Sequence, residues 1–354
     1  MTLDELRGEI DRIDAEIVAL IKARMRCVHG VGEIKKDAHS HIFVPERESQ
    51  LIEKILRHNA GELPENGLKS IYRQIVSMSL HLEGGIKVGY LGPPGTWSHQ
   101  AAQARFGDSV ELLPYPTFQQ IFRSVEIGEI NYGVVPIENS TYGRISQAID
   151  LLGSTELRIC AQVHLNVRNC LLSNTERPNI RKIYSHAQVL GQCREWLRNN
   201  FPNAELISTA STSVAAKIAH DEANNGAAAL GSELAAELNH VKVLERNIQD
   251  KAGNTTRFAV IGNQSTAPSG HDRTTICFGV PHTAGSLVEV LSVFKEHGIN
   301  IYCMDSRPTR DTAWEYLFYI DVEGHAEQSP LKDCVTILHN RTPMFKVLGS
   351  YPEN

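Results

Sequence analysis

The sequence predicts three domains: an all-helical domain, an α/β domain and a small α+β domain, in that order. Stretches rich in glycine or serine at Gly84-Gly85 and at 265–270 indicate linkers, and the apolar pattern changes at each of them. The length of 354 residues also exceeds what one ordinary core accommodates. We therefore expect domains over residues 1–84, 86–263 and 272–351.

The composition excludes several classes of function. Hydrophobic residues make up 42% of the chain and charged residues 21%, as in folded soluble domains. The formal net charge of -6 argues against a nucleic-acid partner, which would require a basic face. No apolar run approaches the roughly 18 residues that span a bilayer, and the first residues do not resemble a secretory signal. We expect neither a nucleic-acid nor a membrane partner.

The seven cysteines are scattered singly along the chain. An odd number without paired spacing indicates reduced thiols, and hence a cytoplasmic protein. The spacing also lacks the close Cys/His pairs of a structural zinc site, so we expect no metal.

The first domain is predicted to contain three helices. Apolar residues recur at helical spacing from Leu3 to Ile21, and the next strong stop comes at Asp37. A second helix is expected over 45–58, with proline tolerated in its first turn, and a third over 68–82.

Charged residues interrupt the apolar face of these helices. Arg24 and Lys35 fall on the stripe of the first helix, while Ser79 and Glu83 share one face of the third. Burying an unpaired cation is costly, so either internal ion pairs or an anionic ligand must accompany them. The pattern alone leaves both explanations open. Arg7 lies about 100° around the helix from Arg24 and is expected to point toward a neighbouring protomer.

This arrangement resembles the all-helical chorismate mutases, which are intertwined dimers. The resemblance covers residues 1–84 and rests on Arg7, Arg24, Lys35, Arg47, Glu48, Ser79 and Glu83. It implies that the three arginines hold the two substrate carboxylates, with Arg7 reaching across the dimer. Lys35 and Glu83 would flank the ether oxygen as catalytic residues, and Glu48 and Ser79 would contact the ring hydroxyl side. Val44 departs from the aspartate of many relatives.

The chemistry implied by this resemblance requires cations rather than a nucleophile. Chorismate rearranges to prephenate without a covalent intermediate, so the enzyme holds the reactive conformer and stabilises charge on the ether oxygen. Glu83 can donate a hydrogen bond to that oxygen only when it is protonated. We therefore expect mutase activity to fall as pH rises, and Glu83→Gln to flatten the profile.

In the second domain, polar clusters follow predicted strands or precede predicted helices. They comprise the glycine-rich turn 92–99, residues 137–141, 185–188, 211–213 and 255–258. Open α/β sheets place ligand sites at such positions, although any single cluster is more often a cap or turn. The spacing of a dinucleotide-binding loop is missing. Several clusters at equivalent positions favour a ligand site.

These clusters resemble the prephenate dehydratase domain over residues 86–263. The matching motifs are Gly92–Ser98, Pro136–Ser140, Tyr184–Gln188, Ala229–Ser232 and Thr256-Arg257-Phe258, with Ala187 in place of a common proline. The resemblance implies two lobes, similar to type 2 periplasmic binding proteins, with the site between them. Thr256 would be catalytic and Arg257 would anchor a substrate carboxylate. The other implied site residues are Asn139, Gln192, Thr96, Ser185, His186, Gln188, Ser211 and Thr212.

The dehydratase reaction needs a proton donor. Prephenate loses carbon dioxide and its ring hydroxyl, and hydroxide leaves only if a proton or strong hydrogen bond reaches it. We favour Thr256 as a positioned donor. His186 is the rival, since imidazole titrates near neutrality.

The third domain shows the pattern of a ferredoxin-like fold. Strands are expected over 273–280, 299–304, 314–322 and 345–348, and helices over 285–297 and 330–339. From this pattern alone, a purely structural appendage remains an alternative.

Two motifs in the third domain resemble the phenylalanine site of ACT regulatory domains, over residues 272–351. They are Ala284–Leu287 and Asp305–Pro308. The implied effector site comprises Gly285, Ser286, Leu287, Asn300, Asp305, Ser306 and Arg307, and such sites normally form between two protomers. Relatives usually have proline at Ala284, alanine at Ser286 and glutamate at Asp305, so affinity for phenylalanine or its coupling to activity is expected to differ.

Together the resemblances imply an enzyme that converts chorismate to prephenate and prephenate to phenylpyruvate, with inhibition by phenylalanine. Neither reaction transfers electrons or groups, so no cofactor is expected, and the enzyme would be a homodimer or higher homo-oligomer. Two alternatives remain. An arogenate dehydratase would act on the transaminated substrate, and a non-catalytic amino-acid sensor would bind phenylalanine without turnover.

Overall fold

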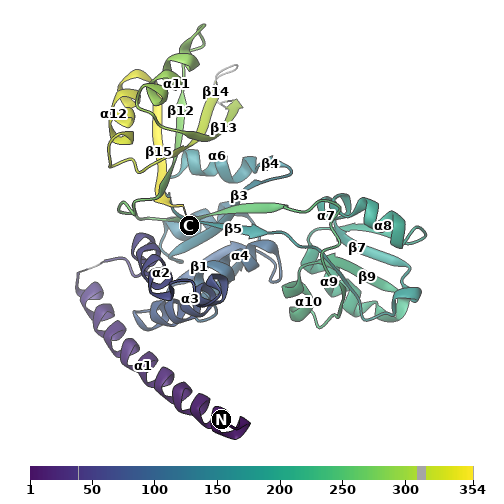
Figure 1. Cartoon of the computed structure of the whole chain (residues 1–354). Coiled ribbons are helices and arrows are strands. Elements are labelled where there is room, and N and C mark those ends of the chain that lie inside the picture. Colours follow the sequence, from purple (N-terminus) through teal and green to yellow (C-terminus); the bar gives the residue numbers. More distant parts are fainter. Residues whose placement is uncertain (39, 309–315, 354) are drawn as a thin grey trace. The chain divides into compact units, whose positions relative to one another are not determined.

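The computed structural model describes residues 1–38, 40–308 and 316–353 (Figure 1). The chain forms two compact units. One contains residues 1–87 and 105–111, and the other contains residues 88–104 and 112–354.

The helical unit contains the three predicted helices, α1 (Leu3–Asp37), α2 (Pro45–Asn59) and α3 (Glu65–Leu82). The prediction for α1 is confirmed, α2 is one residue longer than predicted, and α3 begins three residues earlier, directly after Pro64. A capping box formed by Thr2 and Glu5 satisfies the first backbone donors of α1.

The C-terminal part of α1 lies against the end of α3. Gly32 makes this approach possible, because a Cβ atom there would lie 2.8 Å from the Cα atom of Glu83. Such a distance is shorter than van der Waals contact allows. A glycine that weakens an isolated helix therefore has a packing role in this one.

The helical unit also includes a segment that the sequence assigned to the second domain. Residues 105–111 contact α3, where Ser109 donates its N–H to Ser77 Oγ at 3.0 Å. Gln74 Nε2 donates to Asp108 Oδ2 at 2.9 Å. The helical unit is therefore not confined to the residues before the predicted linker at Gly84-Gly85.

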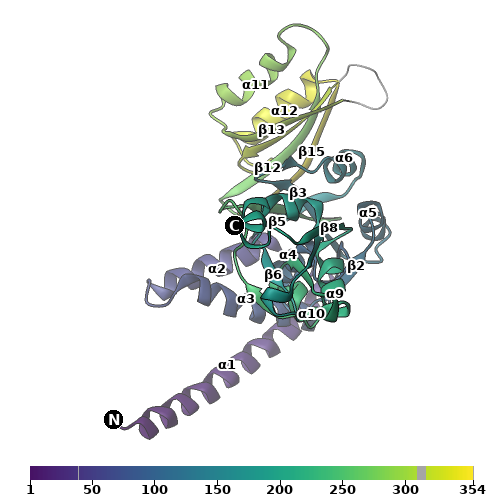
Figure 2. The same cartoon turned by 90° about the vertical axis from the view of Figure 1, so that its right-hand side faces the viewer.

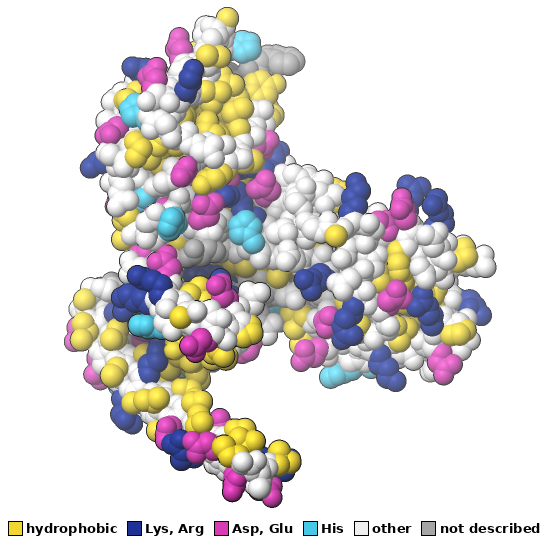
Figure 3. All heavy atoms as spheres, viewed as in Figure 1, with side chains coloured by type: hydrophobic (Ala, Val, Ile, Leu, Met, Phe, Trp, Pro, Cys, Tyr) yellow, Lys and Arg dark blue, Asp and Glu magenta, His cyan; other side chains and the backbone are white. Residues whose placement is uncertain are grey.

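The N-terminal half of α1 exposes its apolar stripe (Figure 3). The exposed fractions are 63% for Leu3, 56% for Ile10 and 47% for Ile17. A stripe of this width on a long helix normally packs against another element.

The second unit begins with a lobe built on a six-stranded sheet of order β2-β1-β3-β11-β5, with β4 paired to β3. The strands are β1 (Lys87–Leu91), β2 (Glu111–Tyr115), β3 (Tyr132–Asn139), β4 (Gly143–Arg144), β5 (Arg158–Asn166) and β11 (Thr255–Gly262). The helices are α4 (Trp97–Phe106), α5 (Phe118–Glu126) and α6 (Ser146–Ser154). The strand β11 comes from far along the chain and lies between β3 and β5, antiparallel to both.

A second lobe follows, with a sheet of order β10-β6-β9-β7-β8. Its strands are β6 (Cys170–Leu172), β7 (Lys182–His186), β8 (Glu205–Thr209), β9 (Ala227–Gly231) and β10 (Val243–Glu245). Its helices are α7 (Ala187–Gln192), α8 (Arg194–Asn200), α9 (Thr212–Asp221) and α10 (Glu233–Leu238). The chain leaves the first lobe after β5 and returns at β11, so the two lobes implied by the sequence resemblance are present.

The C-terminal part has the predicted order of elements: β12 (Asp272–Gly279), α11 (Ser286–Glu296), β13 (Ile301–Pro308), β14 (Tyr316–Glu323), α12 (Leu331–Arg341) and β15 (Met344–Pro352). The sheet has the order β13-β14-β12-β15, and both helices cover one face (Figure 2). The predicted strand over 314–322 starts at Trp314, which lies outside the described residues. β15 extends to Pro352 because it pairs with the full length of β12.

The other face of this sheet contributes to the core of the first lobe. Tyr319, Leu348 and Tyr351 are buried in one cluster with Ile137 and Ala259 of the first lobe. Burial of apolar surface is the main stabilising contribution to such a junction.

None of the helices in the described residues combines the length and apolar content needed to cross a bilayer. None of the seven cysteines forms a disulfide, and no group of three His, Cys, Asp or Glu side chains in residues 1–38, 40–308 and 316–353 is arranged to hold a metal ion.

Candidate active and effector sites

The helical unit brings together four of the residues that the sequence singled out. Lys35 Nζ lies 2.6 Å from Glu83 Oε2, and Arg24 Nη1 donates to Ser79 Oγ at 2.5 Å. Lys35 also donates to the carbonyl oxygen of Ile42 at 2.8 Å. The two cations therefore lie on the face of α1 that contacts the C-terminal end of α3, as the helical spacing predicted.

The two cations differ in their partners. Lys35 has a carboxylate partner, whose side chain is only 10% exposed. Arg24 has a hydroxyl partner, and no carboxylate of the described helical unit lies within ion-pair distance of it. The internal ion pair thus accounts for Lys35, whereas Arg24 retains the capacity to bind an anion.

The remaining predicted mutase residues are Arg7, Arg47 and Glu48. Arg7 is exposed on the N-terminal half of α1, where its closest carboxylate is Asp4 at 3.8 Å. Arg47 is exposed on α2. Glu48 is bound by Arg105 Nη1 at 2.6 Å, with both side chains mostly buried.

Arg105 was not identified from the sequence. Its guanidinium lies 4.9 Å from the ring centre of Phe43, a cation–π contact that fixes it beside Glu48. Burial, reinforced by the positive charge of Arg105, lowers the pKa of neighbouring Arg73. The only sequence signal for Arg105 is its place at the basic end of α4.

In the second unit, the side chains of Thr256 and Asn139 form a buried pair on adjacent strands. The two residues face one another in the β11–β3 register, and Asn139 Nδ2 donates to Thr256 Oγ1 at 2.8 Å. The same Nδ2 donates to Asn254 Oδ1 at 2.9 Å. Because Thr256 accepts this bond, its own O–H hydrogen remains available for another acceptor.

The orientation of the Asn139 amide is fixed by the backbone that follows it. Its Oδ1 accepts hydrogen bonds from the N–H groups of Thr141 at 3.0 Å and of Tyr142 at 3.2 Å. The carboxamide nitrogen must therefore face Thr256, which defines the direction of the hydroxyl.

Several predicted dehydratase residues stabilise local structure. Ser211 caps α9, Ser185 donates to the carbonyl of Leu230 at 2.8 Å, and Thr96 donates to the carbonyl of Leu91 at 2.9 Å. His186 is exposed and caps α7, accepting from the N–H of Gln188. Thr212 is buried at the start of α9, and Gln192 accepts a hydrogen bond from Asn169 at 3.1 Å.

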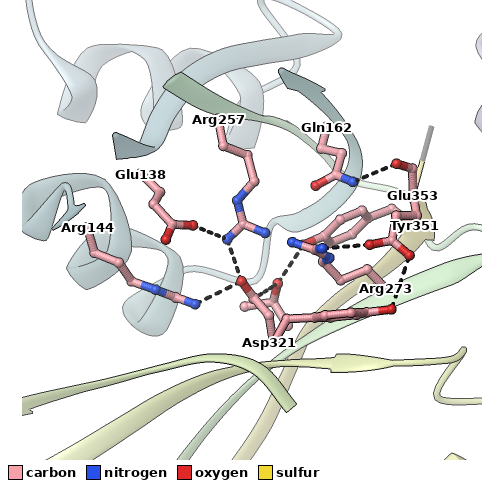
Figure 4. Close-up of polar contacts among 10 residues, drawn as sticks. Glu138, Arg144, Gln162, Arg257, Arg273, Asp321, Tyr351 and Glu353 are labelled. Carbon is pink, nitrogen blue, oxygen red and sulfur yellow. Dashed lines mark hydrogen bonds and ion pairs between the residues drawn. The ribbon is translucent and has the colours of Figure 1, made fainter. Parts of the chain in front are cut away.

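The structure pairs Arg257 with two carboxylates. Successive residues of a strand project to opposite faces, so Arg257 points away from the Thr256–Asn139 pair. Its Nη2 is bound by Asp321 of β14 and lies 3.2 Å from Glu138 Oε2, and its side chain is 4% exposed (Figure 4). The role of Arg257 as anchor of a substrate carboxylate stays a prediction.

The first phenylalanine motif lines a pocket. A cavity of about 350 Å³ is bordered by the loop from Val280 to Val288 and by Tyr316 and Phe318 of β14. Ala284, Gly285, Ser286 and Leu287 all contribute to it. Gly285 has a φ of 93°, in the left-handed region, which glycine adopts without strain.

The second motif lies on the edge strand β13, and its residues are not among those lining the cavity. Asp305 Oδ2 accepts from Arg307 Nε at 3.0 Å, and Arg307 also donates to Ser146 of α6. Ser306 pairs in the sheet with Phe318, which does line the cavity. Asn300 is exposed just before β13.

Comparison with known proteins gives two family matches along the chain. Residues 6–84 match chorismate mutase type II, and residues 88–266 match prephenate dehydratase. A bifunctional chorismate mutase/prephenate dehydratase of Aquifex aeolicus is 43% identical over 99% of this chain and 98% of that protein.

Two solved structures resemble the part of the chain that follows the helices. Prephenate dehydratase from Arthrobacter aurescens, in complex with L-Phe, has a TM-score of 0.70 and 29% identity, and the match covers 76% of this chain and 90% of that one. GqqA, described as a novel type of quorum quenching acylase, also has a TM-score of 0.70, with 27% identity, 76% of this chain and 98% of that one covered. With both family matches and the near full-length relative, the chain belongs to the bifunctional chorismate mutase/prephenate dehydratase family.

Proposed function

We propose that this chain converts chorismate to prephenate in its helical domain and prephenate to phenylpyruvate in its α/β domain, with phenylalanine as inhibitor. One observation carries the proposal: a chain that matches both family models also brings polar residues of each reaction into contact. We assign the activities to residues 1–84 and 86–263, and the inhibition to residues 272–351.

In the mutase reaction, the protein has to hold a dianion and stabilise charge on the ether oxygen. Arg24, which lacks a carboxylate partner among the described residues of its unit, would bind one substrate carboxylate together with Arg47. Lys35 and Glu83 would flank the ether oxygen, with Lys35 stabilising the charge that develops as the C–O bond breaks. Ser79 and Glu48 would complete the site on the side of the ring hydroxyl.

In the dehydratase reaction, Thr256 would donate to the departing hydroxyl. As carbon dioxide leaves, the electrons of the broken C–C bond enter the ring, and those of the C–O bond leave with the hydroxyl, which takes up one proton to become water. Asn139 fixes the Thr256 oxygen by donating to it, which leaves the O–H hydrogen for the substrate. Gln192, Gln188 and His186 of the second lobe would contact the substrate from the other side.

We further propose that residues 272–351 form an ACT domain that binds phenylalanine. The strand order β13-β14-β12-β15, with two helices on one face, is that of a ferredoxin-like fold. The cavity beside Gly285 and Leu287 has a volume suited to one amino acid and combines apolar walls with backbone amides near a positive-φ glycine.

Two features of the single chain support a homo-oligomer. The apolar stripe on the N-terminal half of α1 is exposed, and Arg7 lies on that half, away from Arg24. The second phenylalanine motif, with Asp305, does not line the cavity of its own chain. A second copy that packs on α1 would cover the stripe and bring its Arg7 to the site of the first.

One experiment tests the proposal against its alternatives. Purified full-length protein is supplied with chorismate alone, and prephenate and phenylpyruvate are followed with and without phenylalanine. The proposal expects phenylpyruvate, in amounts that phenylalanine reduces. Accumulation of prephenate alone would leave only the mutase, and turnover of arogenate in preference to prephenate would identify an arogenate dehydratase. Binding of phenylalanine without turnover of any substrate would identify a sensor.

A further inference from the structure

Asp321 is a fully buried carboxylate of the C-terminal sheet whose ionic partners belong to the first lobe. Its side chain is 0% exposed on β14. It accepts from Arg257 Nη2 and, at 2.8 Å, from Arg144 Nη2, while Thr275 Oγ1 donates to its other oxygen at 2.7 Å (Figure 4). The two guanidinium groups extend from β11 and β4.

Arg257, and the carboxylate of Glu138 that lies 3.2 Å from it, are the immediate sequence neighbours of the proposed catalytic pair. Arg257 follows Thr256 on β11, and Glu138 precedes Asn139 on β3. In the register of the two strands, Thr256 faces Asn139 and Arg257 faces Glu138. One face of these strands therefore carries the Thr256–Asn139 pair, and the opposite face is held by Asp321.

The charge balance of the cluster depends on Asp321. Arg257 and Arg144 are 4% and 3% exposed, and Nε and Nη1 of each have no hydrogen-bond partner among the described residues. The other carboxylate, Glu138, is 30% exposed and lies near Arg257 only. Burial alone would raise the pKa of Asp321, but Arg257 and Arg144 outweigh it and lower that pKa. Asp321 is thus the main anionic partner of two buried cations.

The strand that carries Asp321 also borders the effector cavity. Tyr316 and Phe318 line the cavity, and Asp321 lies three residues beyond Phe318 on the same strand. Phe318 stacks on Phe278 of β12, with ring centres 5.5 Å apart. A ligand that shifts β14 at Phe318 would therefore displace Asp321 with it.

We propose that Asp321 is a positioning residue for the dehydratase reaction: it holds Arg257 and Arg144 and so sets the geometry of Thr256 and Asn139 from the C-terminal domain. The same contact transmits phenylalanine binding to the active site. This inference rests on the proposed dehydratase function and adds to it a residue outside the catalytic domain.

The test uses the full-length protein, because the mutase activity of the same chain serves as an internal control. Asp321→Asn removes the charge and keeps the shape of the side chain. Asp321→Asn combined with Arg144→Gln removes one cation as well and restores the charge balance. The matched control is Asp272→Asn, a buried carboxylate whose hydrogen-bond donors among the described residues are Ser269 and Gly270 of the adjoining linker.

We expect Asp321→Asn to lower the dehydratase kcat by roughly 10- to 100-fold, as small misplacements of catalytic groups do, with KM changed by less than about threefold. Mutase activity should be unchanged. Asp321→Asn should still bind phenylalanine, as measured by calorimetry. Phenylalanine should no longer inhibit its residual dehydratase activity. The double variant should recover part of the kcat, and Asp272→Asn should match the wild type.

Two results would overturn the proposal. If Asp321→Asn and Asp272→Asn have the same dehydratase kcat, Asp321 has no positioning role. If the mutase and dehydratase activities fall equally in Asp321→Asn and in the double variant, Asp321 contributes only to stability. If Asp321→Asn alone does not yield soluble protein, the charge-balanced double variant decides by the same comparison. A wild-type protein without phenylpyruvate formation would instead reject the proposed function itself.

Discussion

Lys35 and Glu83 meet at 2.6 Å between the C-terminal ends of α1 and α3. The contact depends on the close approach of the two helices at Gly32, and both side chains are mostly buried. A carboxylate in this ion pair accepts hydrogen bonds and cannot donate one. Glu83 would therefore assist the departing ether oxygen only in the fraction of molecules in which it carries a proton.

Glu83→Gln should flatten the pH profile of the mutase. Glutamine donates a hydrogen bond at any pH, whereas a glutamate carboxylate has no hydrogen to donate, so the variant should depend less on pH than the wild type. The measurement is the rate of chorismate consumption by both proteins across pH 5 to 9, with dehydratase activity on added prephenate as the control for folding. A glutamine variant that keeps the wild-type profile would show that Glu83 does not act as the donor.

Thr256→Val should remove dehydratase activity and leave the mutase intact. Valine preserves the shape of the side chain but has no hydroxyl, and loss of a general acid typically costs roughly 10²- to 10⁴-fold in rate. His186→Asn, at an exposed helix cap, should have a smaller effect. Both variants are assayed for phenylpyruvate formation from prephenate. Near-normal turnover by Thr256→Val together with loss in His186→Asn would reverse the assignment.

The helical part of the chain was predictable because its signals are local. The spacing of apolar residues gave the extent of α1, and extension of the same stripe placed Arg24 and Lys35 toward Ser79 and Glu83. The pattern could not predict the role of Arg105, because its contact with Glu48 joins residues 57 positions apart. Such contacts depend on tertiary structure, for which one sequence carries no periodic signal.

The sequence contains a signal for the side of the strand on which Arg257 lies. Strand alternation requires Thr256 and Arg257 to project to opposite faces, so the two could not share one side of β11. Asp321 also gave a signal that was not used, because it is the only charged residue inside β14 (Tyr316–Glu323), whose other carboxylate, Glu323, is at the exposed end of the strand. A lone carboxylate in a buried strand requires a cationic partner, and the chain offered Arg257 and Arg144.

Gly285→Ala should weaken inhibition by phenylalanine. Alanine at a φ of 93° is strained, so the loop that lines the cavity should change its conformation. We expect the phenylalanine concentration for half-inhibition to rise roughly fivefold, the equivalent of about 1 kcal/mol. Gly298→Ala is the matched control, since it has a φ of 67° and lies outside the cavity lining. Equal shifts in both variants would mean that general strain, and not the site, is responsible.

Ile10→Glu should disrupt the proposed oligomer and the mutase with it. Ile10 lies in the exposed apolar stripe, so a charge there would be buried without a partner between two copies. Sedimentation should show smaller particles, and mutase activity should fall about tenfold or more, as loss of a charged hydrogen bond from Arg7 would cause. Ala15→Glu adds the same charge to the opposite face of α1 and should change neither quantity. An Ile10→Glu protein of unchanged size would contradict this interface.

Asp321 should make the second unit sensitive to acid. Its pKa is lowered in the folded protein because Arg257 and Arg144 outweigh the effect of burial. A carboxylate with a depressed folded pKa contributes stability that is present above its unfolded pKa, near 3.9, and is lost as pH falls toward the folded value, at up to about 1.4 kcal/mol per pH unit. Unfolding midpoints measured in urea between pH 6 and 3 should therefore decline less in the Asp321→Asn/Arg144→Gln variant than in the wild type. Asp272→Asn, whose carboxylate contacts no guanidinium in the part of the chain that the structure describes, should retain the wild-type decline. Parallel declines in the wild type and the double variant would mean that the ion cluster adds nothing to stability, and would place the acid sensitivity in other carboxylates.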